Sequence, residues 1–430
     1  MATIRPFRGC RYNSEAVGDL ASVLCPPYDM IGPELQESLK RLSPYNAVHL
    51  EGGEQPDPVN PEGGYRQAAA LFRDWMEQGV LLRDSEPRFY LMQHGYELPG
   101  QYKNQLGLFA GVGIEDYSRR IVLPHEYTRE PAVLDRVALM EACRAQFSPI
   151  MTLYRDAEGS LRPILEQVRA GQPVLEVKDS PDGDVTLWPV ADGELQERIS
   201  QFFADRPVFL ADGHHRYEAA RRYRREQESK GRVDTNAAYN FVMMALVEFD
   251  DPGLLLLPYH RTVGGLSPDL LAQVQEQLDE LFEAQPVDLA STGGVERLLD
   301  QVAFLGKERH ACALVGPERE DAYLLMLREG VDWQQWGQLA ISEAWVLEEK
   351  ALRPLLGEAM AQHVNYSHDH DLAVEQVASG AQQLAFLFKP FPMDAFESIV
   401  GGGQRLPSKS TFFYPKLPTG LVINQLEGSL

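Results

Sequence analysis

The sequence has few cysteines, no long apolar run and a shortage of positive charge, and each absence excludes a class of protein. Its four cysteines show no pair at the spacing of a zinc site or a redox motif. No run of about 18 apolar residues occurs, and Met1 to Arg8 lacks the apolar core of a signal peptide. We therefore expect a soluble, cytoplasmic protein with no membrane partner and no redox cofactor.

The charge balance argues against nucleic acid as a partner. Lys and Arg number 40 against 63 Asp and Glu, and the net charge of -23 repels a phosphate backbone. Apolar residues make up 44% of the 430 residues, which is typical of an ordered globular chain. This length predicts roughly two or three domains.

Strands and helices alternate along the chain, which predicts a mixed α/β (α+β) architecture. Turn and periodicity signals divide it into an N-terminal mixed region over 1–104, a central region over 105–262 and a C-terminal α/β domain over 263–430. Helical spacing also predicts one long helix over Trp333–Leu352. The familiar phosphate-binding and nucleophile motifs, Walker A, Gly-x-Gly-x-x-Gly and Gly-x-Ser-x-Gly, are all missing from the sequence.

One segment nevertheless has the chemistry of an anion site. An apolar strand over Pro207–Leu210 runs into a long charged helix through Asp212-Gly213-His214-His215-Arg216. The glycine allows close backbone approach, the free N–H groups of the first helical turn favour an anion, and Arg216 offers a planar fork for two phosphate oxygens. Two alternatives stay open: Asp212 only caps the helix above surface histidines, or the two histidines bind a metal.

A second constellation could supply a general base. Glu126 follows His125 in Leu-Pro-His-Glu-Tyr-Thr, and Asp135 and Arg136, at the start of the next predicted helix, complete this candidate catalytic group. Glu126 could accept a proton from a substrate hydroxyl if it lies within hydrogen-bond reach. The alternative is a solvated loop with a structural pair between Asp135 and Arg136.

Three weaker clusters could line a substrate cleft. A Pro-Pro turn presents Tyr28 and Asp29, and a polar pair follows the apolar run at 254–257. A cationic, hydroxyl-bearing segment near the C-terminus suits an anion. The polar pair consists of His260 and Arg261. The segment near the C-terminus contributes Lys409, Ser410, Thr411 and Lys416.

Together these motifs resemble a conserved prokaryotic family known only as a domain of unknown function, number ten-fifteen. The resemblance runs in order through Pro-Pro-Tyr-Asp at 26–29, Leu-Pro-His-Glu at 123–126, Ser-Pro-Ile at 148–150, Ala-Asp-Gly-His-His-Arg-Tyr at 211–217, Pro-Tyr-His-Arg at 258–261 and Lys-Ser-Thr-Phe-Phe-Tyr-Pro-Lys at 409–416.

The Asp-Gly-His-His-Arg core also resembles the phosphate-binding loop of the ParB/sulfiredoxin fold, which includes archaeal free serine kinases that use ADP. This resemblance implies a ParB/sulfiredoxin-like module in which residues 212–216 cradle nucleotide phosphates, Glu126 is the base and His125 is its neighbour. It also requires an insertion between Ile150 and Asp212.

We therefore expect a phosphotransferase, in one version a kinase for free serine or another small hydroxylated amino acid. A nucleotide such as ADP or ATP, or pyrophosphate, would be the donor with Mg²⁺, no protein-bound metal site is predicted, and a homodimer is compatible with the sequence. The alternative is a nucleotide-binding switch without turnover.

Overall fold

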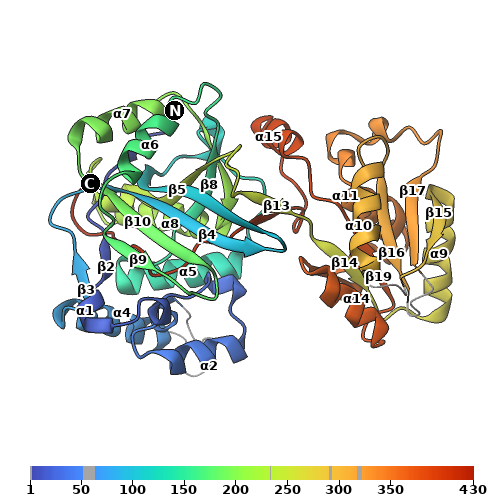
Figure 1. The fold of residues 1–430 in the computed structure, drawn as a ribbon, viewed down its shortest axis with the longest axis horizontal. Coiled ribbons are helices and arrows are strands. Elements are labelled where there is room, and N and C mark those ends of the chain that lie inside the picture. The colour runs from blue at the N-terminus through green and yellow to red at the C-terminus, as the bar shows by residue number, and fades with distance from the viewer. Residues whose placement is uncertain (1, 52–62, 233, 290–292, 317–321) are drawn as a thin grey trace. The chain divides into compact units, whose positions relative to one another are not determined.

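The computed structural model describes residues 2–51, 63–232, 234–289, 293–316 and 322–430. The chain forms two compact units. The first comprises Met1–Leu255 and Pro415–Leu430, and the second comprises Leu256–Tyr414. Helices and strands alternate in both (Figure 1), which confirms the predicted mixed α/β class. None of the helices in the described ranges is both long and apolar enough to cross a membrane.

A nine-stranded mixed sheet forms the first unit. Its order is β6-β11-β8-β12-β5-β4-β10-β9, with β1 added beside β5. The sheet pairs β11 in parallel with β6 and antiparallel with β8. Its strands are β1 (Ile4–Arg5), β4 (Phe89–Leu98), β5 (Gln101–Gly113), β6 (Val122–Leu123), β8 (Ile150–Tyr154), β9 (Leu175–Val177), β10 (Asp184–Val190), β11 (Val208–Asp212) and β12 (Phe241–Glu248).

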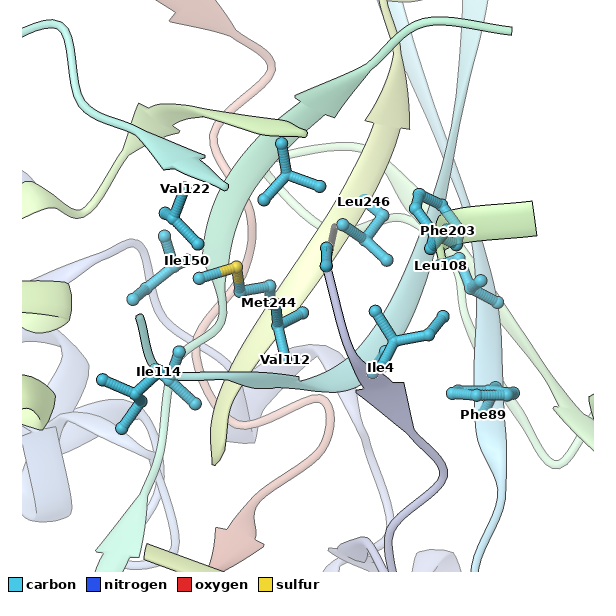
Figure 2. Packing of buried hydrophobic residues seen from close by; sticks show 14 of the residues in the cluster. Ile4, Phe89, Leu108, Val112, Ile114, Val122, Ile150, Phe203, Met244 and Leu246 are labelled. Atoms are coloured by element: carbon cyan, nitrogen blue, oxygen red, sulfur yellow. The ribbon is translucent and has the colours of Figure 1, made fainter. Parts of the chain in front are cut away.

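Alternate residues of these strands build the main core, because side chains of a strand point to opposite faces in turn. Leu108 and Val112 of β5 and Met244 and Leu246 of β12 belong to this core, in which Phe203 lies beside Leu108 and Leu246 (Figure 2). The core helices are α5 (Glu130–Cys143), α6 (Arg162–Arg169), α7 (Gly193–Phe203) and α8 (His214–Ser229).

Smaller elements complete the first unit. They are the paired strands β2 (Cys10–Tyr12) and β3 (Leu81–Arg83), the paired strands β7 (Ala145–Gln146) and β21 (Asn424–Gln425), the helices α1 (Ser14–Val17), α2 (Pro33–Leu42), α3 (Val48–Glu51) and α4 (Gly63–Glu77), and the 3₁₀ turns η1 (Ala21–Val23), η2 (Tyr28–Met30), η3 (Tyr117–Arg119) and η4 (Ala238–Asn240).

The structure divides the chain differently from the predicted domains. The boundary between residues 104 and 105 falls inside β5, whose pairing with β4 continues across it. The second unit begins at Leu256, and residues 415–430 belong to the first unit, where β21 pairs with β7. The segment between Ile150 and Asp212 adds β9 and β10 to the large sheet, so any insertion there is part of the same core.

An antiparallel six-stranded sheet in the order β15-β17-β16-β19-β14-β18 forms the second unit. Leu384 and Phe386 of β19 face one core, and Ala385 and Leu387 face the other, so helices cover both faces. The strands are β14 (His260–Val263), β15 (Phe282–Val287), β16 (Ala311–Val315), β17 (Ala322–Leu327), β18 (Val364–Ser367) and β19 (Leu384–Leu387), with a separate pair formed by β13 (Leu255–Leu257) and β20 (Phe412–Tyr414).

The two cores take different helices. The core that includes Leu384 and Phe386 contains residues of α9 (Pro268–Leu281). The core that includes Ala385 and Leu387 contains residues of α10 (Gly294–Leu305) and α14 (His370–Ala378). The remaining helices are α11 (Glu343–Val346), α12 (Arg353–Leu356), α13 (Met360–His363) and α15 (Met393–Gly401), with the 3₁₀ segments η5 (Trp333–Trp336), η6 (Gln338–Ile341) and η8 (Gly357–Ala359) and the π-helical segment η7 (Leu347–Leu352).

The long helix predicted over Trp333–Leu352 is wrong. Gly337 has a φ of 92°, which ends one 3₁₀ turn and begins another. The side chain of Ser342 then caps α11 by accepting from the N–H of Trp345. Because a left-handed glycine and a cap both interrupt helical hydrogen bonding, periodic apolar spacing alone does not produce one helix here.

Candidate phosphate-binding site

The segment Asp212–Arg216 lies where β11 ends and α8 begins. Gly213 is the N-cap of α8 with a φ of 91°, a left-handed conformation that favours glycine. The N–H of Tyr217 is bonded to the Gly213 carbonyl, whereas N–H groups nearer the start of an α-helix have no acceptor within the helix. The helix dipole adds partial positive charge, so this turn suits an anion.

Two cations hold the Asp212 carboxylate at this turn. Lys416 Nζ lies 2.6 Å from Oδ1, and Arg216 Nη2 lies 2.7 Å from Oδ2. Burial alone would raise the pKa of Asp212, but the Lys416 and Arg216 charges outweigh it and keep that pKa well below its usual range. Asp212 is therefore a carboxylate near neutral pH.

Arg216 is occupied by the protein rather than open to solvent. Its Nη1 donates to the Pro149 carbonyl at 2.6 Å and its Nη2 donates to Asp212. Its Nε is buried and has no hydrogen-bond partner among the described residues. The Arg216 guanidinium was expected to bind two phosphate oxygens. In this structure both of its Nη atoms already donate to oxygen atoms of the protein.

Replacing Gly213 with alanine is expected to destabilise the protein by at least about 2 kcal/mol. The new Cβ would lie 2.9 Å from Arg216 Nε, in a backbone conformation that already costs an L-residue energy. Gly159→Ala is the control, because Gly159 has a φ of 64° but no atom within 4 Å of the place where its new Cβ would lie. Urea unfolding of both variants measures the difference, and equal losses would show that the contact with Arg216 is unimportant.

His214 and His125 fix each other beside the turn. The buried His125 donates from Nδ1 to the Leu210 carbonyl at 2.6 Å, and its main-chain N–H donates to His214 Nε2 at 3.2 Å. The two rings meet edge to face with centroids 4.4 Å apart. Burial lowers the pKa of His125, so its imidazole is neutral at physiological pH.

His215 holds the same loop at a second point. Its Nε2 accepts the main-chain N–H of Arg129 at 3.1 Å. Burial lowers the pKa of His215, and the Arg129 charge lowers it further, whereas Glu126 and Asp29 act in the opposite direction. His214 and His215 therefore both accept a main-chain hydrogen bond through Nε2.

Acidification is expected to weaken the His125 contribution to stability. The unfolded chain binds more protons than the folded chain below the ordinary histidine pKa of about 6.5, so the free energy of unfolding falls as pH drops below that value. His125→Asn keeps a donor for Leu210 but does not titrate. We expect the stability difference between wild type and this variant to shrink by up to about 1 kcal/mol between pH 7.5 and pH 5.5 in urea unfolding. An unchanged difference would contradict the prediction.

Glu126 is half-buried and lies next to these imidazoles. In the described part of the chain, His125, Glu126 and His214 are the group whose potential ligand atoms all lie within 4.8 Å of one another. Such closeness could also hold a metal, but His214 Nε2 and His125 Nδ1 already have hydrogen-bond partners. A half-buried carboxylate at this position is a candidate general base, a role that requires hydrogen-bond reach to a substrate proton.

Arg136 is buried in an ion-pair network with the half-buried Asp135, rather than forming an open catalytic pair with it. Arg136 contacts Asp135 Oδ2 at 2.5 Å and Glu51 Oε1 at 3.6 Å, and donates to the Glu51 carbonyl. Its guanidinium lies 4.1 Å from the centre of the Tyr28 ring, and Ser148 donates to Glu51 at 2.7 Å. Arg136 is only 5% exposed, so its predicted catalytic role does not fit its position.

A family model described as a protein of unknown function (DUF1015) matches residues 4–349. The chain belongs to this family. The match confirms the family predicted from the motifs, and its span includes Glu126 and residues 212–216 but ends before Lys416. A comparison with curated proteins gives no match.

Solved structures also resemble this member of the family. They include a conserved hypothetical protein from Pyrococcus furiosus with 11% identity, covering 70% of this chain and 90% of that one at a TM-score of 0.31. A mutant free serine kinase in complex with ADP has 11% identity, with 77% and 95% covered and a TM-score of 0.37. C-terminally truncated SbnI from Staphylococcus aureus has 12% identity, with 75% and 87% covered and a TM-score of 0.34. At these TM-scores we draw nothing about the site from the likeness.

The first unit of this family member gathers many of the predicted site residues. Tyr28 lies beneath the Arg136 guanidinium, and burial raises its pKa to about 12 while the charges of Arg136 and Arg216 act in the opposite direction. The residues gathered around the turn are Tyr28, Asp29, His125, Glu126, Asp212, Gly213, His214, His215, Arg216 and Lys416.

Five further predicted residues, His260, Arg261, Lys409, Ser410 and Thr411, belong to the second unit. Arg261 is 2% exposed and is paired with Glu348 at 2.7 Å, so it is a buried structural cation rather than a residue of an open cleft. Lys409 lies over the Tyr259 ring, 4.9 Å from its centre. Ser410 donates to the Pro407 carbonyl, Thr411 is buried, and His260 lines a cavity of the second unit.

Glu51 and Arg129 are part of the site region but were not predicted. Glu51 is 3% exposed and accepts from Ser148, and the N–H of Arg129 donates to His215. Nothing local in the sequence marks Glu51, because its partners Arg136 and Ser148 are far along the chain. Arg129 acts through its main chain, which any residue except proline could provide.

Proposed function

We propose that this family member is a phosphotransferase that moves a phosphoryl group from a nucleotide, or from pyrophosphate, to the hydroxyl of a small amino acid such as L-serine. The observation that supports it best is the placement of Glu126 beside a helix N-terminus that also carries Lys416 and Arg216. Phosphoryl transfer requires mainly positioning and electrostatic stabilisation, which such a cluster supplies.

The donor phosphates would bind at the first turn of α8, where Gly213 lets the main chain approach. An incoming phosphate would compete with Asp212 for Lys416 and Arg216, since both cations now contact that carboxylate. The anion would also lie beside the Asp212 carboxylate, which Lys416 and Arg216 neutralise in this structure.

Glu126 would accept the proton of the substrate hydroxyl. The hydroxyl oxygen forms a new bond to phosphorus, the bond from phosphorus to the bridging oxygen breaks, and its electron pair stays on the departing phosphate. His125 and His214 would position Glu126 through the loop that they hold. Transfer from ADP would leave AMP, and transfer from ATP would leave ADP.

The protein offers Mg²⁺ few ligands at this turn. Both Asp212 oxygens contact cations, so Glu126 and Asp29 are the other carboxylates among the residues gathered at this turn. Mg²⁺ is commonly bound by one or two carboxylates together with substrate phosphates. We therefore expect the ion to arrive with the donor phosphates, where it would neutralise phosphate charge.

Phosphorus NMR tests the proposal. The purified full-length protein is incubated with Mg²⁺, L-serine and, in separate samples, ADP, ATP, CTP and pyrophosphate. A phosphoserine signal that requires both protein and serine would support the proposal and identify the donor. Donor signals that shift on binding without any product would favour the nucleotide-binding switch instead, and no shift with any donor would contradict both.

A further inference from the structure

The second unit contains a cavity of about 510 Å³ that the proposed function does not use. It lies at the edge of the six-stranded sheet where β18 and β19 end and β14 begins, as the pairing of His260 with Ser367 shows. Residues of α10 and the first residue of α14 complete its lining. A volume of this order is typical of sites for small organic molecules.

His260 presents a fixed hydrogen-bond donor to this cavity. It is 2% exposed, and its Nδ1 accepts the main-chain N–H of Phe388 at 3.2 Å. The neutral ring must then carry its proton on Nε2, for which the described residues offer no acceptor. Burial, followed by the charges of His370 and Arg261, lowers the pKa of His260 to about 3, so the ring is neutral at physiological pH.

The charges around the cavity are of both signs. Asp300 of α10 is exposed at its lining and forms no ion pair in the described ranges. Asp369 is already engaged, because its carboxylate accepts the N–H of Leu372 at 3.1 Å and caps α14. Lys389 is engaged as well, since its Nζ lies 2.7 Å from Glu343.

Two simpler ligands fit this lining poorly. A phosphate would meet the Asp300 and Asp369 carboxylates while Lys389 is neutralised by Glu343. A simple amine would leave the buried N–H of His260 without an acceptor, which costs free energy. The histidines that line this cavity do not form a group of three potential metal ligands. In the described residues such a group, His125, Glu126 and His214, lies in the first unit.

We propose that this cavity binds a free α-amino acid as its zwitterion. The α-ammonium group pairs with Asp300, and the α-carboxylate accepts from His260 Nε2 and lies near the N-terminus of α14 at His370. The side chain packs against Leu257, Leu299 and Phe388, which supply the apolar part of the lining. This binding does not depend on the proposed phosphoryl transfer.

Isothermal titration calorimetry on the full-length protein tests this site with glycine, L-serine, L-leucine and L-phenylalanine. Two leucine analogues each lack one charge of the zwitterion. N-acetyl-L-leucine has no α-ammonium group, and L-leucinamide has no α-carboxylate. We expect at least one amino acid to bind, and the matching analogues to bind about tenfold more weakly or not at all. No binding by any of the four amino acids would overturn the proposal.

Two variants locate the site. Asp300→Asn keeps shape and removes the anion, so we expect affinity to fall about tenfold. His260→Asn keeps an acceptor for the main-chain N–H of Phe388 and removes Nε2, so we expect a similar fall in affinity. Asp279→Asn is the control, because Asp279 is exposed on α9, which packs on the other core. Equal affinity in wild type and Asp300→Asn would overturn the proposal, even if His260→Asn fails to fold.

A third variant separates this site from the proposed reaction. Glu126→Gln is expected to stop phosphoryl transfer and to leave amino-acid binding in the second unit unchanged. Binding that survives in this variant, with or without turnover in the wild type, supports the cavity. Binding that disappears in Glu126→Gln would assign the amino acid to the first unit and overturn the inference.

Discussion

Replacing Asp212 with asparagine is expected to lower the free energy of unfolding by about 3 to 5 kcal/mol at pH 7. The substitution leaves the Lys416 and Arg216 charges in place without the carboxylate that neutralises them. The side chains are 16%, 10% and 15% exposed for Lys416, Arg216 and Asp212, so water screens them little. Two nearby uncompensated cations therefore destabilise the folded state.

The loss depends on pH in a defined direction. The folded-state pKa of Asp212 lies well below its usual range, so its stabilising effect is present above the unfolded pKa of about 3.9 and is lost as pH falls through the folded pKa. Urea unfolding between pH 7 and pH 3 should show a constant difference between wild type and Asp212→Asn down to about pH 4, and a difference that begins to shrink below that pH.

Asp250→Asn provides the control for an ion pair in solvent. Asp250 is 76% exposed and lies 2.5 Å from Arg155, so its loss is expected to cost less than about 1 kcal/mol. If Asp212→Asn were no more harmful than Asp250→Asn, the cluster at the start of α8 would not be an important part of the fold.

Local patterns predicted the elements around this cluster. Apolar spacing and turn residues in the sequence predict a strand over Ile150–Tyr154 and a helix around Gly193–Phe203, and these are the bounds of β8 and α7. Gly213 marks the turn between β11 and α8. These features depend on residues adjacent in the sequence, whose propensities and caps act over a few positions. The family could be predicted for the same reason, because its motifs are short and contiguous.

Contacts between distant residues could not be predicted in the same way. Lys416 contacts Asp212 across 204 positions, and no local signal identifies that pairing. The side chain of Arg216 was expected to face a phosphate, yet Pro149 and Asp212 take both of its Nη atoms. In the second unit, likewise, His260 Nδ1 accepts the main-chain N–H of Phe388, a residue far along the chain that no local pattern connects with His260.

The replacement of Glu126 by glutamine is expected to reduce phosphoryl transfer by about 10² to 10⁴-fold. Glutamine keeps the size of the side chain but cannot accept the proton of the substrate hydroxyl. Donor binding should change little, because the groups proposed to hold phosphates are the first turn of α8, Lys416 and Arg216. The readout is the initial rate of product formation, with donor affinity measured separately by calorimetry.

Glu130→Gln is the matched control for this experiment. Glu130 starts α5, four residues after Glu126, and pairs on the surface with Arg222 at 2.8 Å. Its side chain is 63% exposed, so its loss should leave the rate near that of the wild type. A rate for Glu126→Gln within about threefold of the Glu130→Gln rate would exclude Glu126 as the base, because a positioned general base contributes much more than that. A large loss together with unchanged donor affinity would assign the proton transfer to Glu126 and separate it from phosphate binding at α8.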